Sequence, residues 1–338
     1  MNFDKFLRYI LQISLFLLKK SGKNENLSFT HYFSHIFMLF LIGVALSASL
    51  FLIFRAFNKL GINTFQAIVT NYWTCVITAL LYVWDFEAVA SISWENLWTK
   101  VPLVLGFIFI STFYLMGFVA QNISISASSV AAKISLIIPV GFNLLFFNTD
   151  KKFDWLNYLG LACVFVAIFL TSSKVETEEP QAKTQKSWGN IILISLIFLM
   201  SGAIDTSINW VSKESAKDAT SQALFSMLIF GVAGIIGVII LLKKVIVDKE
   251  KIEMKSIGGG IVLGVVNYFS VIFMIRSLQV EFSNNGAFFF PVFNIAIILF
   301  STAFAILLFK ERLNTLNKIG IGVAVLAILL ISYQSILR

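Results

Sequence analysis

Long apolar stretches alternate with short polar connections along nearly the whole chain. A helix needs roughly 20 apolar residues to cross a bilayer, and most of these stretches have about that length. The pattern predicts an all-α integral membrane protein with ten transmembrane helices. We place them near residues 36–57, 63–84, 101–120, 125–147, 155–173, 188–210, 219–242, 257–278, 283–309 and 314–336.

The composition agrees with this pattern. Hydrophobic residues make up 58% of the 338 residues and charged residues only 13%, whereas a soluble domain has about 25% charged residues. The apolar stretches are continuous rather than alternating, which excludes a β-barrel. The net charge of +8 comes from Lys and Arg that flank the apolar stretches, as is usual beside membrane helices. We therefore predict no nucleic-acid partner.

A proline phrase occurs twice, half a chain apart. Residues 135–147 read SLIIPVGFNLLFF and residues 288–300 read FFFPVFNIAIILF, so Pro139 and Pro291 hold equivalent places. Proline removes a backbone hydrogen bond and clashes with the carbonyl one turn earlier, so both helices should be kinked. Within a bilayer such kinks lie where helices meet or a cavity opens.

Further matches in the same order indicate an internal duplication. Gln66-Ala67 corresponds to Gln222-Ala223, Val104 to Gly106 corresponds to Val262 to Gly264, and Gly160 corresponds to Gly320. An odd number of helices in each half gives two inverted five-helix repeats, the architecture of alternating access. After its proline, the first copy is shorter by about two helical turns. We divide the chain into a peripheral segment (1–35), a first repeat (36–173), a charged linker (174–187) and a second repeat (188–338).

These features resemble the drug/metabolite transporter superfamily, EamA-like branch. The resemblance extends through LLFKERLNTLNKIGIGVAVLAILLIS (residues 307–332), where Glu311 ends one span and Gly320 opens the next; Asp150 stands near the equivalent place in the first half. It implies a transporter in the plasma membrane with both termini cytoplasmic. Counting Lys and Arg without the first 35 residues favours the opposite orientation.

Two ionisable residues lie well inside predicted spans. A charge at the bilayer centre costs at least ~2.5–3.5 kcal/mol, so Lys133 and Asp205 are candidate site residues. Lys133 can meet a substrate carboxylate or phosphate, and Asp205, with Asn209 one turn later, can carry a coupling proton or bind an ammonium group. The alternative is a fixed structural pair between Lys133 and Asp205. Asn285 is the neutral counterpart of Lys133 in the second half.

Several neutral polar and aromatic residues lie near the middle of other spans. Ligand pockets are mostly apolar and aromatic with a few directed polar groups, so some of these residues should line a cavity. Hydrogen bonding between helices is the alternative role for each of them. The set comprises Asn71, Trp73, Tyr114, Asn267 and Tyr268.

Other chemistry is not indicated. Gly258 to Gly260 lack the Lys-Ser/Thr of a phosphate-binding loop and should permit close helix contact. The two histidines, His31 and His35, precede the first span, so we predict neither a catalytic site nor a metal site and no cofactor. Arg55 and Arg276 lie near span ends and should extend to the headgroups.

The sequence therefore predicts a secondary transporter rather than an enzyme. It should export a small amphipathic, amino-acid-like metabolite, a substrate class that rests on the family resemblance. The predicted partners are the substrate, the lipid bilayer and a coupling proton, and the protein should be a monomer or homodimer. The alternatives are a sugar-phosphate or nucleotide-sugar exchanger, which should have clustered cations in its cavity, and a non-transporting membrane scaffold or sensor, which needs no polar cavity.

Overall fold

The described residues of the computed structural model are almost entirely helical. Residues 1–27, 85, 91, 94, 140, 141, 143–153, 172–187, 215–218, 281–285, 337 and 338 lie outside the description. Met1–Met38 and Leu39–Arg338 form two units. The described part of the first unit is the beginning of a helix, and the contacts below belong to the second. The peripheral segment 1–35 and the linker 174–187 therefore lie largely or wholly outside the described residues.

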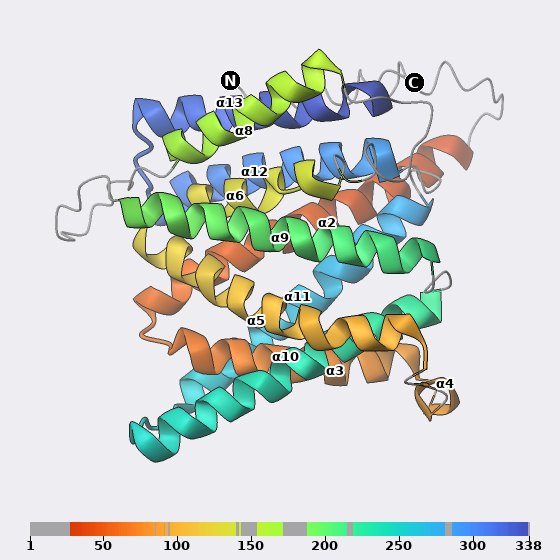
Figure 1. Cartoon of the computed structure of the whole chain (residues 1–338), viewed down its shortest axis with the longest axis vertical. Coiled ribbons are helices and arrows are strands. Elements are labelled where there is room, and N and C mark those ends of the chain that lie inside the picture. Colours follow the sequence, from red (N-terminus) through yellow and green to blue (C-terminus); the bar gives the residue numbers. More distant parts are fainter. Residues whose placement is uncertain are drawn as a thin grey trace. The chain divides into compact units, whose positions relative to one another are not determined.

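The described helices are labelled in Figure 1. They are α2 (Ser28–Lys59), α3 (Thr64–Val83), α4 (Phe86–Ala90), α5 (Leu97–Asn122), α6 (Ile125–Ile134), α8 (Trp155–Thr171), α9 (Trp188–Glu214), α10 (Ala219–Val247), α11 (Met254–Val280), α12 (Gly286–Phe309) and α13 (Thr315–Ile336).

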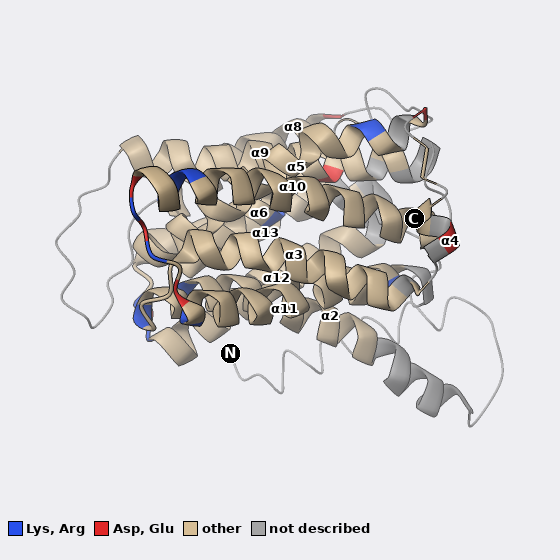
Figure 2. Ribbon diagram, turned by 90° about the horizontal axis from the view of Figure 1, so that it is seen from below, with Lys and Arg blue, Asp and Glu red and all other residues tan. Residues whose placement is uncertain are grey.

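Seven of the ten predicted spans are confirmed as helices long and apolar enough to cross a membrane, within the described part of the chain. The other three form shorter apolar helices, Ile125–Pro139, Trp155–Thr171 and Thr315–Ile331. Charged residues gather at helix ends and in connections, and few lie along the helices (Figure 2). The seven spans are Met38–Lys59, Thr64–Tyr82, Thr99–Asn122, Trp188–Ile208, Thr220–Val247, Met254–Leu278 and Phe289–Phe309.

The two proline phrases adopt different structures. In the first, α6 ends at Ile134, and a turn at Ser135 and Leu136 precedes Pro139. Proline has no N–H to give to the carbonyl four residues earlier, and that carbonyl, of Ser135, instead accepts a hydrogen bond from the Ile138 N–H at 2.9 Å. In the second, α12 runs through Pro291 without interruption. Pro291 lies in the second turn of α12 and removes one intrahelical bond, the one to the Ala287 carbonyl.

Glycines allow the central helices to approach closely. A Cβ at Gly260 of α11 would lie 2.5 Å from the Ala67 carbonyl oxygen of α3, and one at Gly106 of α5 would lie 2.5 Å from Val232 of α10. A Cβ at Gly258 would meet nothing within 4 Å. The predicted role of the GGG stretch in close helix contact is therefore confirmed at Gly260 and is wrong at Gly258.

The α8–α13 pair is held by reciprocal hydrogen bonds. Asn157 of α8 donates from Nδ2 to the Ile331 carbonyl of α13 at 3.0 Å, and Asn317 of α13 donates from Nδ2 to the Thr171 carbonyl of α8 at 3.5 Å. Both asparagines are buried. Each helix therefore uses its first turns to bind the last turns of the other, and α8 and α13 lie side by side in Figure 1.

Two glycines make equivalent close contacts in the same helix pair. A Cβ at Gly160 would meet Ile331 at 2.6 Å, and a Cβ at Gly320 would meet Thr171 at 2.8 Å. These are the two glycines that the sequence aligns between the halves, and they take equivalent places in one helix pair. Elsewhere α3 packs against α10 and α11, α10 against α5, and α6 against α12.

Candidate functional site

Lys133 is the one residue of α6 that is not fully buried. Ser124 caps this helix by accepting a hydrogen bond from the Ala127 N–H at 3.3 Å, and every other residue of α6 is buried. Lys133 lies in the last turn and is half-buried. Placing a cation on such a buried helix costs free energy, and a nearby negative group offsets that cost.

Asp205 of α9 is that partner. The two side chains interact electrostatically, and the Ser135 hydroxyl just beyond α6 lies within hydrogen-bonding reach of the carboxylate. The α6 and α9 helices are in contact, and a Cβ at Gly202 of α9 would lie 2.2 Å from Ile138. This close approach brings the predicted charges together.

Asp205 occupies an exposed position of α9. Phe198 and Ser201, which lie on the same face of α9 at helical spacing, are both buried, whereas Asp205 is exposed. A carboxylate on this face is thus accessible to a ligand and close to a cation. Two groups of opposite charge that interact in this way can together bind a small molecule that carries both charges.

Asn71 and Asn267 bind each other instead of facing a cavity. Asn267 Nδ2 donates to Asn71 Oδ1 at 3.2 Å and lies 3.6 Å from the Cys75 sulfur, while the Cys75 thiol donates to the Gly264 carbonyl at 3.4 Å. Both asparagines are almost wholly buried. This cluster joins α3 to α11, which is the alternative role that the sequence left open for them.

Trp73 and Tyr268 also take part in helix packing. The Trp73 indole lies against α10, where a Cβ at Gly234 would be 3.2 Å from its Nε1. Its ring shares an exposed face of α3 with Ile77. Tyr268 is buried, and its ring packs edge-on against Tyr82 with centroids 6.0 Å apart.

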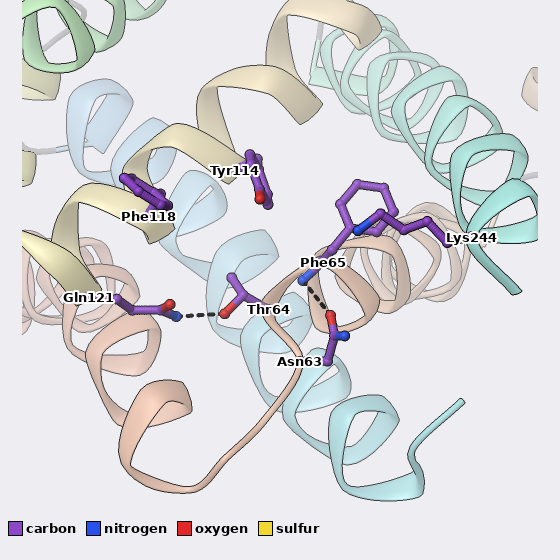
Figure 3. A pocket seen from close by; sticks show the side chains of 7 residues that line it. All are labelled: Asn63, Thr64, Phe65, Tyr114, Phe118, Gln121 and Lys244. Carbon is purple, nitrogen blue, oxygen red and sulfur yellow. Dashed lines mark hydrogen bonds between the residues drawn. The ribbon is translucent and has the colours of Figure 1, made fainter. Parts of the chain in front are cut away.

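Tyr114 lines a separate pocket at one end of α3, α5 and α10. This pocket has a volume of about 270 Å³ (Figure 3), and neither Lys133 nor Asp205 is among its lining residues. Lys244 lies over the Phe65 ring at 5.0 Å and 3.8 Å from Glu250. The lining residues are Asn63, Thr64, Phe65, Tyr114, Phe118, Gln121 and Lys244.

The remaining predicted residues are only partly described. Asn209 belongs to α9, but its side chain lies outside the described residues, as does the whole of Asn285. Pro139 and Pro291 are both buried.

Arg55 was predicted to extend to the headgroups, and the structure shows that this is wrong. The side chain is only 5% exposed. It donates from Nη1 to the Gln121 carbonyl and, at 3.5 Å, to the Ala120 carbonyl. These carbonyls end α5 and lack partners within the helix, so they attract a cation. Arg276, in contrast, is exposed and donates to the Tyr82 hydroxyl at 2.8 Å.

Glu311 was noticed in the sequence only as part of a family motif. It lies in the connection between α12 and α13, is 3% exposed, and binds the start of α6. Its carboxylate accepts hydrogen bonds from the Ile125 N–H at 3.0 Å and the Ser124 hydroxyl at 3.3 Å. Burial raises the pKa of this carboxyl above its ordinary value; the Ile125 bond and Arg55 oppose the shift without cancelling it. The serine-rich start of α6 was the available signal, since serine often precedes a helix.

Comparison with known proteins establishes a shared fold and no activity. No known family profile matches the chain. An uncharacterised protein of Haemophilus influenzae (strain ATCC 51907 / DSM 11121 / KW20 / Rd) is 26% identical over 299 residues, which cover 87% of this chain and 97% of that protein. A chain known from a crystal structure superposes with a TM-score of 0.53 at 10% identity and covers 88% of this chain and 98% of its own. The fold thus extends over most of the chain.

Proposed function

We propose that this protein is a secondary transporter of the drug/metabolite transporter superfamily, EamA-like branch. In this proposal ten membrane segments form two inverted five-helix halves that rock against each other in the plasma membrane. The substrate is a small amphipathic, amino-acid-like metabolite, and the direction is export.

The observation that carries this proposal is the Lys133–Asp205 pair. A cation from an otherwise buried helix interacts with an exposed carboxylate of the neighbouring helix. An amino acid presents a carboxylate and an ammonium group a few ångströms apart, so it can replace each member of the pair with its own opposite charge. Such an exchange leaves neither charge without a partner.

The reciprocal bonds of α8 and α13 support the two-half arrangement. Asn157 and Asn317 make equivalent bonds in opposite directions between one helix of each half. Two halves related by an axis in the membrane plane produce this kind of exchange. A single charge pair also favours a zwitterion over a phosphorylated substrate, because phosphate recognition uses several cations or a bidentate arginine.

Transport measurements with charge variants test the proposal. In proteoliposomes, a panel of radiolabelled amino acids should include one whose uptake is lost by at least about tenfold in both Lys133→Ala and Asp205→Ala, because each variant leaves a lone charge. Lys249→Ala is the matched control, since Lys249 is an exposed lysine in a connection; its uptake should equal that of the wild type. Normal uptake by either pair variant contradicts the assignment, and no uptake of any amino acid by the wild type contradicts the substrate class.

A further inference from the structure

The turn between α5 and α6 is a buried junction of two helix ends. Arg55 occupies the carbonyl end of α5, and Glu311 occupies the N–H end of α6. Each charge has the sign that stabilises the helix end it meets. The two side chains also interact electrostatically, so this junction is one connected network of charges and backbone groups.

Glu311 differs from the rest of the network because it comes from the other half of the chain. Gln121 donates from Nε2 to the Phe54 carbonyl at 2.9 Å and to the Thr64 hydroxyl at 2.6 Å. These bonds and that of Arg55 tie α5 to α2 and α3 within the N-terminal half. Glu311 binds Ile125 across 186 positions of sequence. Its carboxylate therefore fastens the C-terminal half to the start of the helix that carries Lys133.

The charge of this carboxylate decides how strongly the two halves are fastened here. Ionised, Glu311 attracts Arg55 and the partial positive charge of the α6 N-terminus; protonated, it loses both attractions. Arg55 of α2 acts on it electrostatically, Lys59 of α2 lies over the Phe309 ring at 5.6 Å, and the last two turns of α5 carry no ionisable side chain. In α6 the ionisable residue is Lys133, at the opposite end, while Lys310 and Arg312 beside Glu311 in sequence are exposed.

We infer that Glu311 binds the coupling proton and that its protonation releases the start of α6 from the α12–α13 connection, so that this end of the protein can open. This inference rests on the proposed transport function. It assigns the proton to Glu311 and leaves Asp205 to bind substrate with Lys133. Burial raises the pKa of this carboxyl and so favours its protonated form.

Amide hydrogen exchange of the purified full-length protein in nanodiscs tests the release directly. After correction for intrinsic exchange, protection of the amides of residues 124–130 should fall about tenfold between about pH 8 and about pH 5. The reason is that protonation of Glu311 removes its charge-assisted bonds to the Ile125 N–H and the Ser124 hydroxyl. Glu311→Gln should show the low protection at both pH values, since glutamine has the shape of the protonated acid. Glu311→Asp retains an ionisable group and should restore the pH dependence.

Asp248→Asn is the matched control, since it neutralises an exposed carboxylate after α10. It should exchange as the wild type does at both pH values. Protection in Glu311→Gln that still changes with pH as in the wild type overturns the inference. A drop in Glu311→Gln that extends equally over α8 and α13 indicates general unfolding and also overturns it, because the release should be confined to the start of α6.

Uptake measurements separate this inference from the proposed function. With the amino acid that the screen identifies, wild-type uptake should depend on a pH gradient. Glu311→Gln should retain uptake and lose that dependence, and Asp248→Asn should retain both. Gradient-dependent uptake in Glu311→Gln refutes the inference while transport stands; no uptake in the wild type refutes the transport function, and hydrogen exchange then still decides whether Glu311 controls the start of α6.

Discussion

Individual polar residues in this protein have distinct roles that their chemistry alone does not reveal. Asn71 and Asn267 pair between helices, Arg55 binds helix-terminal carbonyls, and Asp205 is accessible on a buried face. In an apolar environment a polar group must find a partner or remain accessible to water. The role of each side chain therefore depends on which of these two conditions its surroundings satisfy.

The Asn71–Asn267 bond predicts a measurable coupling. Asn71→Ala and Asn267→Ala should each lower the free energy of unfolding by about 0.6–2 kcal/mol, the range of hydrogen bonds between membrane helices. Because they remove the same bond, the double variant should cost less than the sum of the two. Unfolding in mixed micelles measures these differences.

Asn122→Ala is the control for the comparison of the single and double variants. Asn122 is exposed and bonds within its own helix to the Phe118 carbonyl, so the change should be within about 0.5 kcal/mol of zero. Strictly additive effects of Asn71→Ala and Asn267→Ala would show that the two side chains act independently.

At the scale of elements, close helix contact depends on where glycine lies as well as on how often it occurs. The GGG stretch at the start of α11 contains one glycine pressed against α3 and another with open space. Only a glycine that faces a neighbouring backbone determines the distance between two helices. The same composition thus has different consequences at adjacent positions.

The contrast between Gly258 and Gly260 can be tested by substitution within α11. Gly260→Ala should lower the free energy of unfolding by about 1–3 kcal/mol, because the added methyl group would collide with the Ala67 carbonyl and Thr70. Gly258→Ala should be neutral or stabilising by up to about 1 kcal/mol, since alanine favours the helix. Thermal or denaturant unfolding of the two variants compares them, and equal effects would rule out a close α3–α11 contact at Gly260.

At the scale of the whole molecule, the number of spans in each half should determine on which side of the membrane the linker and the termini lie. If both halves cross five times, residues 174–187 lie on the side opposite both termini. Single cysteines introduced into this linker and near the C-terminus should then be labelled by impermeant reagents from opposite sides of intact cells. Labelling from the same side would contradict an odd number of crossings in the second half.

Much of the fold could be predicted from the chain because its signals are local. Apolar length predicts where helices lie, and proline and glycine predict where they break or approach. The candidate charges, Lys133 and Asp205, could be recognised for the same reason, since an ionisable residue within an apolar run is costly wherever the run packs.

The partners of these residues could not be predicted, because pairing depends on the rotation and register of helices far apart in sequence. A helix turns by about 100° per residue, so a shift of one position turns a side chain from a cavity to a neighbour. The length of the apolar runs and the ionisable residues within them thus predicted the helices and the candidate charges. Only the tertiary structure decided that Asn71 meets Asn267, that Arg55 is buried, and that Glu311 fastens the start of α6, because these contacts exist only once the helices pack.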